Sequence, residues 1–202
     1  MTYAWNMLLV INTINQMYQE YTDQLDAFQA SGKGDPFKCL IDLHGLISGF
    51  KATSTWEGEK YSEILKQACG GHGYSQYAGL ARLHTDFGFG FQMTEGDNTV
   101  MAQQTSKYLL KQVQTGKISL TEFAYSTDSK LSVDEELLLF YEMRFKNELA
   151  SAAQELQEAP GSFEEKWNSL ALVSLVNCTV YFCEWWSLTN FYCILKGKHL
   201  FA

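Results

Sequence analysis

A cluster of glycines near the middle of the chain reads Cys-Gly-Gly-His-Gly over residues 69–73. Each glycine costs about 1 kcal/mol inside a helix, so this segment predicts a turn where the backbone takes positive φ or approaches a ligand closely. Further along, Glu95 directly precedes a segment with helical spacing. A glycine turn and a carboxylate at a helix entrance together form a candidate ligand site. The alternative is a connecting loop whose acidic residue is favoured by the helix macrodipole.

Long helices must position these residues, because apolar side chains recur at steps of three and four along most of the chain. The first helix is predicted from a stripe formed by Met7, Ile11, Ile14, Tyr18, Tyr21, Leu25 and Phe28. Further helices are predicted over about 39–68 and 97–114. Capping-box signatures at Ser132 and Ser162 predict two more helix starts. Residues 70–94 are predicted to be coil and 119–130 a connector.

The amino-acid composition narrows the classes of protein to which this chain can belong. The chain has 202 residues, of which 46% are hydrophobic and 19% charged, as in a globular protein. Its net charge of −8 excludes a non-specific nucleic-acid surface. The five cysteines include no C-x-x-C pair, which indicates a reducing compartment. The four histidines show no ligand spacing, so no metal site is predicted.

Residues 170–195 carry a single charge, Glu184. A segment of this length could span a bilayer. However, Asn177 and Asn190 also lie within it, and an intramembrane carboxylate costs a few kcal/mol. A helix buried in the core of an oligomer is therefore the favoured interpretation, and a membrane span is not expected.

Two motifs in order carry a resemblance to a known family. Cys-Gly-Gly-His-Gly-Tyr-Ser at 69–75 is followed by Glu-Gly-Asp-Asn-Thr-Val at 95–100 and by a helix with Gln-Thr-x-x-Tyr-Leu at 104–109. This combination resembles the acyl-CoA oxidases, which are peroxisomal flavoenzymes of the acyl-CoA dehydrogenase superfamily. The resemblance implies an all-α helical bundle of the C-terminal domain type over residues 1–118, followed by the start of a second helical domain over 119–202.

The resemblance also implies a reaction. Glu95 would remove the α-proton of an acyl-CoA while a hydride passes to FAD, and O2 would reoxidise the flavin to give H2O2. This base needs a largely dry pocket, where desolvation raises a carboxyl pKa. A homodimer and a peroxisomal location are implied too, although the chain ends in Leu-Phe-Ala rather than Ser-Lys-Leu. The implied FAD contacts are Gln67, Gly70, Gly71, Gly73, Asn98 and Thr99.

Two other functions stay open at this point. The chain could be a non-catalytic helical protein that acts by association through the family's dimer surface. It could also be an acyl-CoA dehydrogenase, although the Glu-Gly-Asp-Asn-Thr-Val motif fits the oxidases better. Of two further polar residues, His44 is expected to be a satisfied interhelical side chain and Lys51 a solvated or capping charge.

Overall fold

The structure is a computed structural model that describes residues 2–120, 131–158 and 160–197, and in these ranges every regular element is helical. The all-α prediction is therefore confirmed. Most of the predicted connector 119–130 lies outside the described residues. The long helices are α1 (Thr2–Ser31), α2 (Pro36–Ala68), α6 (Asn98–Gln114), α7 (Val133–Glu158) and α9 (Leu172–Leu195).

The boundaries of these helices follow from their capping residues. Asp35 caps α2 by accepting a hydrogen bond from the amide of Phe37, and Pro36 takes the first helical position, where its missing N–H costs nothing. The helix therefore begins three residues before the predicted 39. Asp97 caps α6, and Gly116 with φ 75° follows its last turn, which ends at the predicted residue 114. Both predicted capping boxes, at Ser132 and Ser162, are present.

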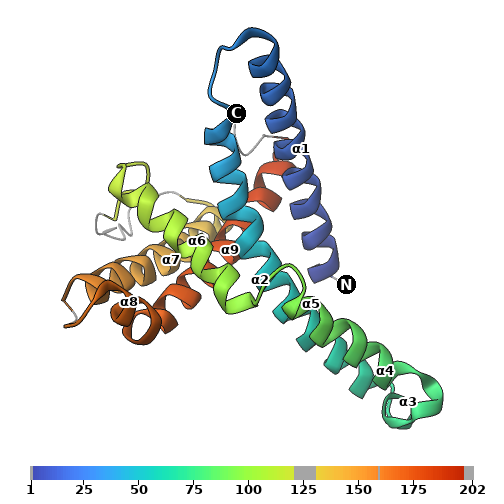
Figure 1. Ribbon diagram of the computed structural model, residues 1–202. Coiled ribbons are helices and arrows are strands. Elements are labelled where there is room, and N and C mark those ends of the chain that lie inside the picture. Colours follow the sequence, from blue (N-terminus) through green and yellow to red (C-terminus); the bar gives the residue numbers. More distant parts are fainter. Residues whose placement is uncertain (1, 121–130, 159, 198–202) are drawn as a thin grey trace.

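Helix α1 lies antiparallel to α2, α6 and α9 pack against α2, and α7 packs against α9 (Figure 1). Their shared core includes Val10, Phe50, Leu109, Phe145 and Phe182, all buried. The predicted stripe on α1 is wrong at two positions, because Ile11 and Tyr18 are exposed while Val10 and Met17 face the core. Val10 and Ile11 both fit a helical period, as do Met17 and Tyr18, so only the packing of the helices determines which of the two is buried.

Helix α9 is covered by its own chain. It packs against α1, α2, α6 and α7, and Leu175, Cys178, Phe182, Cys183 and Trp186 on it are buried. The buried side of α9 is therefore covered without a second copy, whereas Val173, Phe191 and Leu195 on the same helix are exposed. The placement of α9 in an oligomer core stays a prediction. Within the described part of the chain, no helix has the length and apolar character required to cross a membrane. Helices from both predicted domains contribute to the same core, and the division at residue 118 stays a prediction.

The second half of α2 extends beyond the bundle as an arm (Figure 1). Four short elements pack along it: α3 (Gly71–Tyr74), α4 (Leu80–His84), a π-helical turn over Thr85–Phe89 and α5 (Gly90–Met93). The prediction of coil for 70–94 is wrong. Elements of four or five residues are too short to show a hydrophobic period or to be stable alone, and here packing against α2 stabilises them.

A similar interruption precedes the last long helix. The short α8 (Phe163–Glu165) leads into a π-helical turn over Lys166–Leu170 before α9 begins. The indole Nε1 of Trp167 donates a 2.7 Å hydrogen bond to Gln103 on α6, which ties this turn to the bundle.

His44 is exposed, so the expectation of a satisfied interhelical histidine is wrong.

Candidate functional site

The turn that carries Glu95 is held by one lysine. Lys51 on α2 donates from Nζ to the carbonyl oxygen of Gln92 at 3.0 Å, to that of Gly96 at 2.5 Å and to Oδ1 of Asn98 at 2.7 Å. Charge-assisted hydrogen bonds of this kind contribute more than neutral ones. The prediction of a capping charge at Lys51 is therefore confirmed. The ammonium group binds the carbonyl oxygens of the turn between α5 and α6.

Glu95 adopts an unusual backbone conformation. Its φ is 66°, the one positive φ among the described residues other than glycine, and Gly96 follows with φ 107°. A non-glycine residue in this region costs roughly 1–2 kcal/mol. The side chain of Glu95 is exposed in this chain. A dry environment for its carboxylate would therefore have to come from protein or ligand beyond these residues.

Asn98 is built into the structure instead of facing solvent. It is 2% exposed, and its Oδ1 accepts from Lys51 and from Thr55 Oγ1. Its Nδ2 donates to the carbonyl of Ala52 at 3.3 Å. The side chain is thus fully used in fastening the turn to α2. Neighbouring Thr99 is half-buried, and its backbone amide donates to Asp97.

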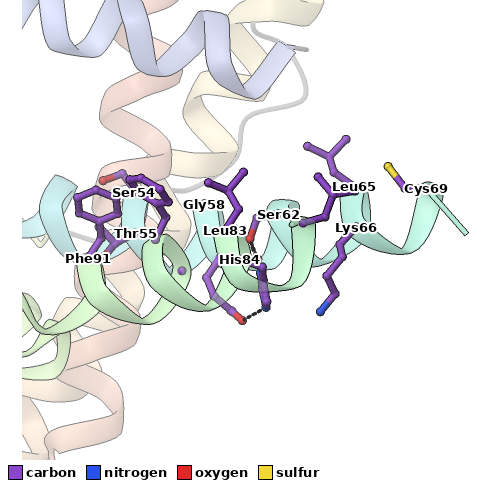
Figure 2. Close-up of a pocket in the computed structure, with 14 residues that line it drawn as sticks. Ser54, Thr55, Gly58, Ser62, Leu65, Lys66, Cys69, Leu83, His84 and Phe91 are labelled. Atoms are coloured by element: carbon purple, nitrogen blue, oxygen red, sulfur yellow. Dashed lines mark hydrogen bonds and ion pairs between the residues drawn. The ribbon is translucent and has the colours of Figure 1, made fainter. Parts of the chain in front are cut away.

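An apolar groove of about 600 Å³ runs along the arm between α2 and the α4–α5 segment (Figure 2). Its apolar lining includes Leu65, Leu80, Leu83, Phe87 and Phe91. At the bundle end it is lined by Thr55, which also bonds Asn98. Because Asn98 lies three residues after Glu95, the groove leads towards the Glu95 turn.

A polar cluster fastens α4 to α2 at the middle of the groove. His84 Nδ1 lies 2.8 Å from Ser62 Oγ (Figure 2). Its Nε2 lies 3.2 Å from a carboxylate oxygen of Glu63. Hydrogen bonds from Lys66 and then from Gln67 lower the pKa of Glu63. Sequence reasoning missed this cluster, because it joins residues from two elements whose packing was not predicted.

The glycine turn forms a second hollow, of about 530 Å³, at the tip of the arm. Gln67, Gly70 and Gly73 all line it, so the structure brings together three of the predicted cofactor-binding residues. A Cβ at Gly73 would lie 1.8 Å from the carbonyl oxygen of Lys66, so this glycine is required by packing on α2. At Gly71, a Cβ would meet nothing within 4 Å.

These features bear on whether FAD fits. Gly71 has neither a positive φ nor a close neighbour, so nothing inside the chain requires glycine there. Open backbone of this kind leaves room for the close approach of a flat or phosphate-bearing ligand. Glu95, Asn98 and Thr99 lie near Lys51, about 24 Å along α2 from Gln67 at 1.5 Å per residue. The predicted site residues thus form two groups at opposite ends of the groove.

No metal-ligand set complements these groups. Across residues 2–120, 131–158 and 160–197, the structure brings together no group of three or more His, Cys, Asp or Glu side chains that could hold a metal ion.

Comparisons with known proteins agree with these features. Residues 1–110 match the family model described as acyl-CoA oxidase, C-alpha1 domain. Human peroxisomal acyl-coenzyme A oxidase 1 is 32% identical over 177 residues, which cover 76% of this chain and 26% of that protein. A probable acyl-coenzyme A oxidase from Caenorhabditis elegans is 40% identical over 99 residues, covering 49% of this chain and 14% of that protein.

Solved structures share the fold. Acyl-CoA oxidase 1 of Arabidopsis thaliana superposes with a TM-score of 0.77 at 24% identity, covering 96% of this chain and 31% of that one. Acyl-CoA oxidase-1 of Caenorhabditis elegans, complexed with FAD and ATP, gives a TM-score of 0.74 at 21% identity, covering 98% and 31%. The matched part of the chain thus covers between 14% and 31% of the length of these relatives. With more than half of its residues matched by the family model, this chain belongs to the acyl-CoA oxidase family.

Proposed function

We propose that this chain supplies the helical side of an FAD-dependent acyl-CoA oxidase site, which dehydrogenates acyl-CoA at the α and β carbons in fatty acid β-oxidation. The observation that carries the proposal is the Glu95–Gly96 turn, which Lys51 holds in a strained conformation. Thr55 lines the bundle end of the apolar groove and bonds Asn98, three residues after Glu95. Strained backbone conformations persist where the surrounding structure determines them, and they cluster at functional sites.

In this proposal each part of the chain has a defined task. The Glu95 carboxylate accepts the α-proton of the acyl thioester. Bound FAD supplies the hydride acceptor and its reoxidation by O2, with release of H2O2. Gln67, Gly70, Gly71 and Gly73 would contact FAD at the tip of the arm, and Asn98 and Thr99 would order the backbone beside the base.

The rest of the oxidase would come from protein outside these 202 residues. The relatives are three to four times longer than the matched part, and other domains would provide the second wall of the flavin and acyl sites. We expect assembly as a homodimer, and a peroxisomal location like that named for the human relative.

The decisive experiment is Glu95→Gln in an assembly that contains those other domains. It should retain flavin, because Glu95 is not among the expected flavin contacts, and lose turnover by about three orders of magnitude or more. Glu20→Gln, on an exposed face of α1, is the control and should be fully active. Near wild-type turnover in Glu95→Gln would show that another group is the base.

A second candidate function is non-catalytic association. It is favoured by the exposed apolar side chains of the arm, among them Leu65 at 67% and Met93 at 65% exposure. A flavin absorption spectrum in the purified assembly would separate the oxidase from this alternative. Peroxide release that depends on O2 would separate it from an acyl-CoA dehydrogenase.

A further inference from the structure

The three hydrogen bonds of Lys51 use its whole donor capacity. A lysine ammonium group has three N–H donors, and Lys51 directs them to Gln92, Gly96 and Asn98. No donor is left for a phosphate or a carboxylate of a ligand. The function of this charge must therefore lie in the turn that it binds.

The three acceptors surround Glu95 along the chain. Gln92 lies three residues before it at the end of α5, Gly96 directly after it, and Asn98 three residues after it at the start of α6. Bonds on both sides restrict the intervening backbone, where Glu95 has its positive φ. Without such restraint, a residue with a Cβ would leave this conformation.

Lys51 is itself fixed, because its helix belongs to the core. Phe50 and Ala52 beside it are 5% and 0% exposed, and the carbonyl of Ala52 accepts from Asn98. Thr55, one turn further along α2, also bonds Asn98. Hydrogen bonds thus fix the Glu95 turn directly to α2, a helix of the core.

We infer that Lys51 is the positioning residue for Glu95: by bonding both flanks of the Glu95–Gly96 turn to α2, it sets the one backbone conformation in which the carboxylate is presented. The catalytic part of this inference rests on the proposed function, because Lys51 can position a base only if Glu95 is one. The conformational part concerns the chain alone and is measured without flavin or turnover.

The first test uses nuclear magnetic resonance of the 202-residue chain. In Lys51→Met, amide exchange at Thr94, Thr99 and Val100 should accelerate about tenfold or more, because charge-assisted bonds are lost. The one-bond Cα–Hα coupling of Glu95, which is smaller at positive φ, should rise towards the value of ordinary residues. Lys51→Arg keeps a donor group and should retain the small coupling.

The matched control is Lys60→Met, which removes an exposed lysine from the same helix. It should leave the coupling of Glu95 and the exchange of the three amides unchanged. If Lys51→Met gives the same spectra as Lys60→Met, the inference is overturned. If Lys51→Met does not fold, Lys51→Gln replaces it, and an unchanged Glu95 coupling in that variant would equally overturn the inference.

The second test separates positioning from the base assignment. In the assembly with the remaining oxidase domains, Lys51→Met should lower kcat about a hundredfold with KM and flavin content unchanged. An unchanged kcat alongside an inactive Glu95→Gln would overturn the positioning role while the base assignment stands. Full activity in Glu95→Gln would instead overturn the base assignment, and the spectra of the chain alone would still decide whether Lys51 sets the turn.

Discussion

At the scale of single residues, the backbone conformation of Glu95 lowers the stability of the fold while the surrounding bonds fix the position of its side chain. Its φ of 66° costs roughly 1–2 kcal/mol relative to a helical or extended conformation. The bonds from Lys51 and the buried side chain of Asn98 offset that cost. An ordinary loop would instead place glycine or asparagine at such a position. The side chain at residue 95 is therefore retained against the local conformational preference.

Replacing the carboxylate residue by glycine should accordingly stabilise the chain. Glu95→Gly removes the strain but adds about 0.4–1 kcal/mol of unfolded-state entropy, which leaves a net gain of about 0.5–1 kcal/mol. The free energy of unfolding from urea titration measures this gain. The control Glu20→Gly lies in the exposed interior of α1 and should lose about 1 kcal/mol. Equal losses in both variants would mean that Glu95 is not strained.

At the scale of elements, glycine allows α2 and α6 to pack closely. A Cβ at Gly45 would lie 2.4 Å from Cγ of Tyr108, and Thr105 Oγ1 donates to the Gly45 carbonyl at 2.7 Å. On α6, the Thr105 and Ser106 hydroxyls are buried and bonded to α2 and α9 respectively. Small residues thus let backbone and hydroxyl groups meet between these helices.

Two glycines of α2 should respond oppositely to alanine. Gly45→Ala overlaps Tyr108 and should cost about 1–3 kcal/mol. Gly58→Ala meets nothing within 4 Å and should gain up to about 1 kcal/mol from helix propensity. Thermal unfolding followed by circular dichroism measures both changes. A stabilising Gly45→Ala would contradict the close packing of α2 and α6.

The stability of the first turn of α7 should depend on pH. Hydrogen bonds from the Ser132 backbone amide and then from its hydroxyl lower the pKa of Glu135 below its ordinary value of 4.5. The unfolded chain therefore binds the proton more readily, so this capping box stabilises the helix above the ordinary pKa and is lost as pH falls through the folded value. Acid titration of the Ser132 and Glu135 amide shifts should show the loss.

Glu135→Gln provides the contrast for that titration. Its amide oxygen can still accept from Ser132 but does not titrate, so the helix start should become insensitive to acid. Glu136→Gln, which leaves the capping box intact, should behave as the wild type does. A wild-type titration curve in Glu135→Gln would assign the effect to another carboxylate.

The long elements could be predicted from sequence, whereas the arm could not. Periods of three and four and the capping boxes predicted the long helices to within a few residues. The short helices of 71–93 left no periodic signal, because contacts with α2 stabilise them. Motif resemblance singled out Glu95 and the glycine turn, and those site assignments stay predictions. The acceptors of Lys51 depend on three-dimensional contacts that spacing does not reveal.

At the scale of the whole molecule, a well-buried bundle carries an exposed arm. The core joins α1, α2, α6, α7 and α9, while the groove, the glycine turn and Glu95 all lie along the arm or at its base. Apolar residues that line the groove, such as Leu65 and Phe87, are exposed. In the proposed oxidase, this surface faces the cofactor and the other domains.

The isolated chain should therefore neither hold FAD tightly nor oxidise acyl-CoA. A few hydrogen bonds at the tip contribute about 1 kcal/mol each, whereas association costs at least several kcal/mol, so the Kd should be micromolar at best. Glu95 is exposed, so the described residues leave its carboxylate open to water. Flavin fluorescence during titration of the purified chain measures the binding, and a peroxide assay with a long-chain acyl-CoA measures the turnover. Steady peroxide production that disappears in Glu95→Gln would show that these 202 residues form a complete oxidase.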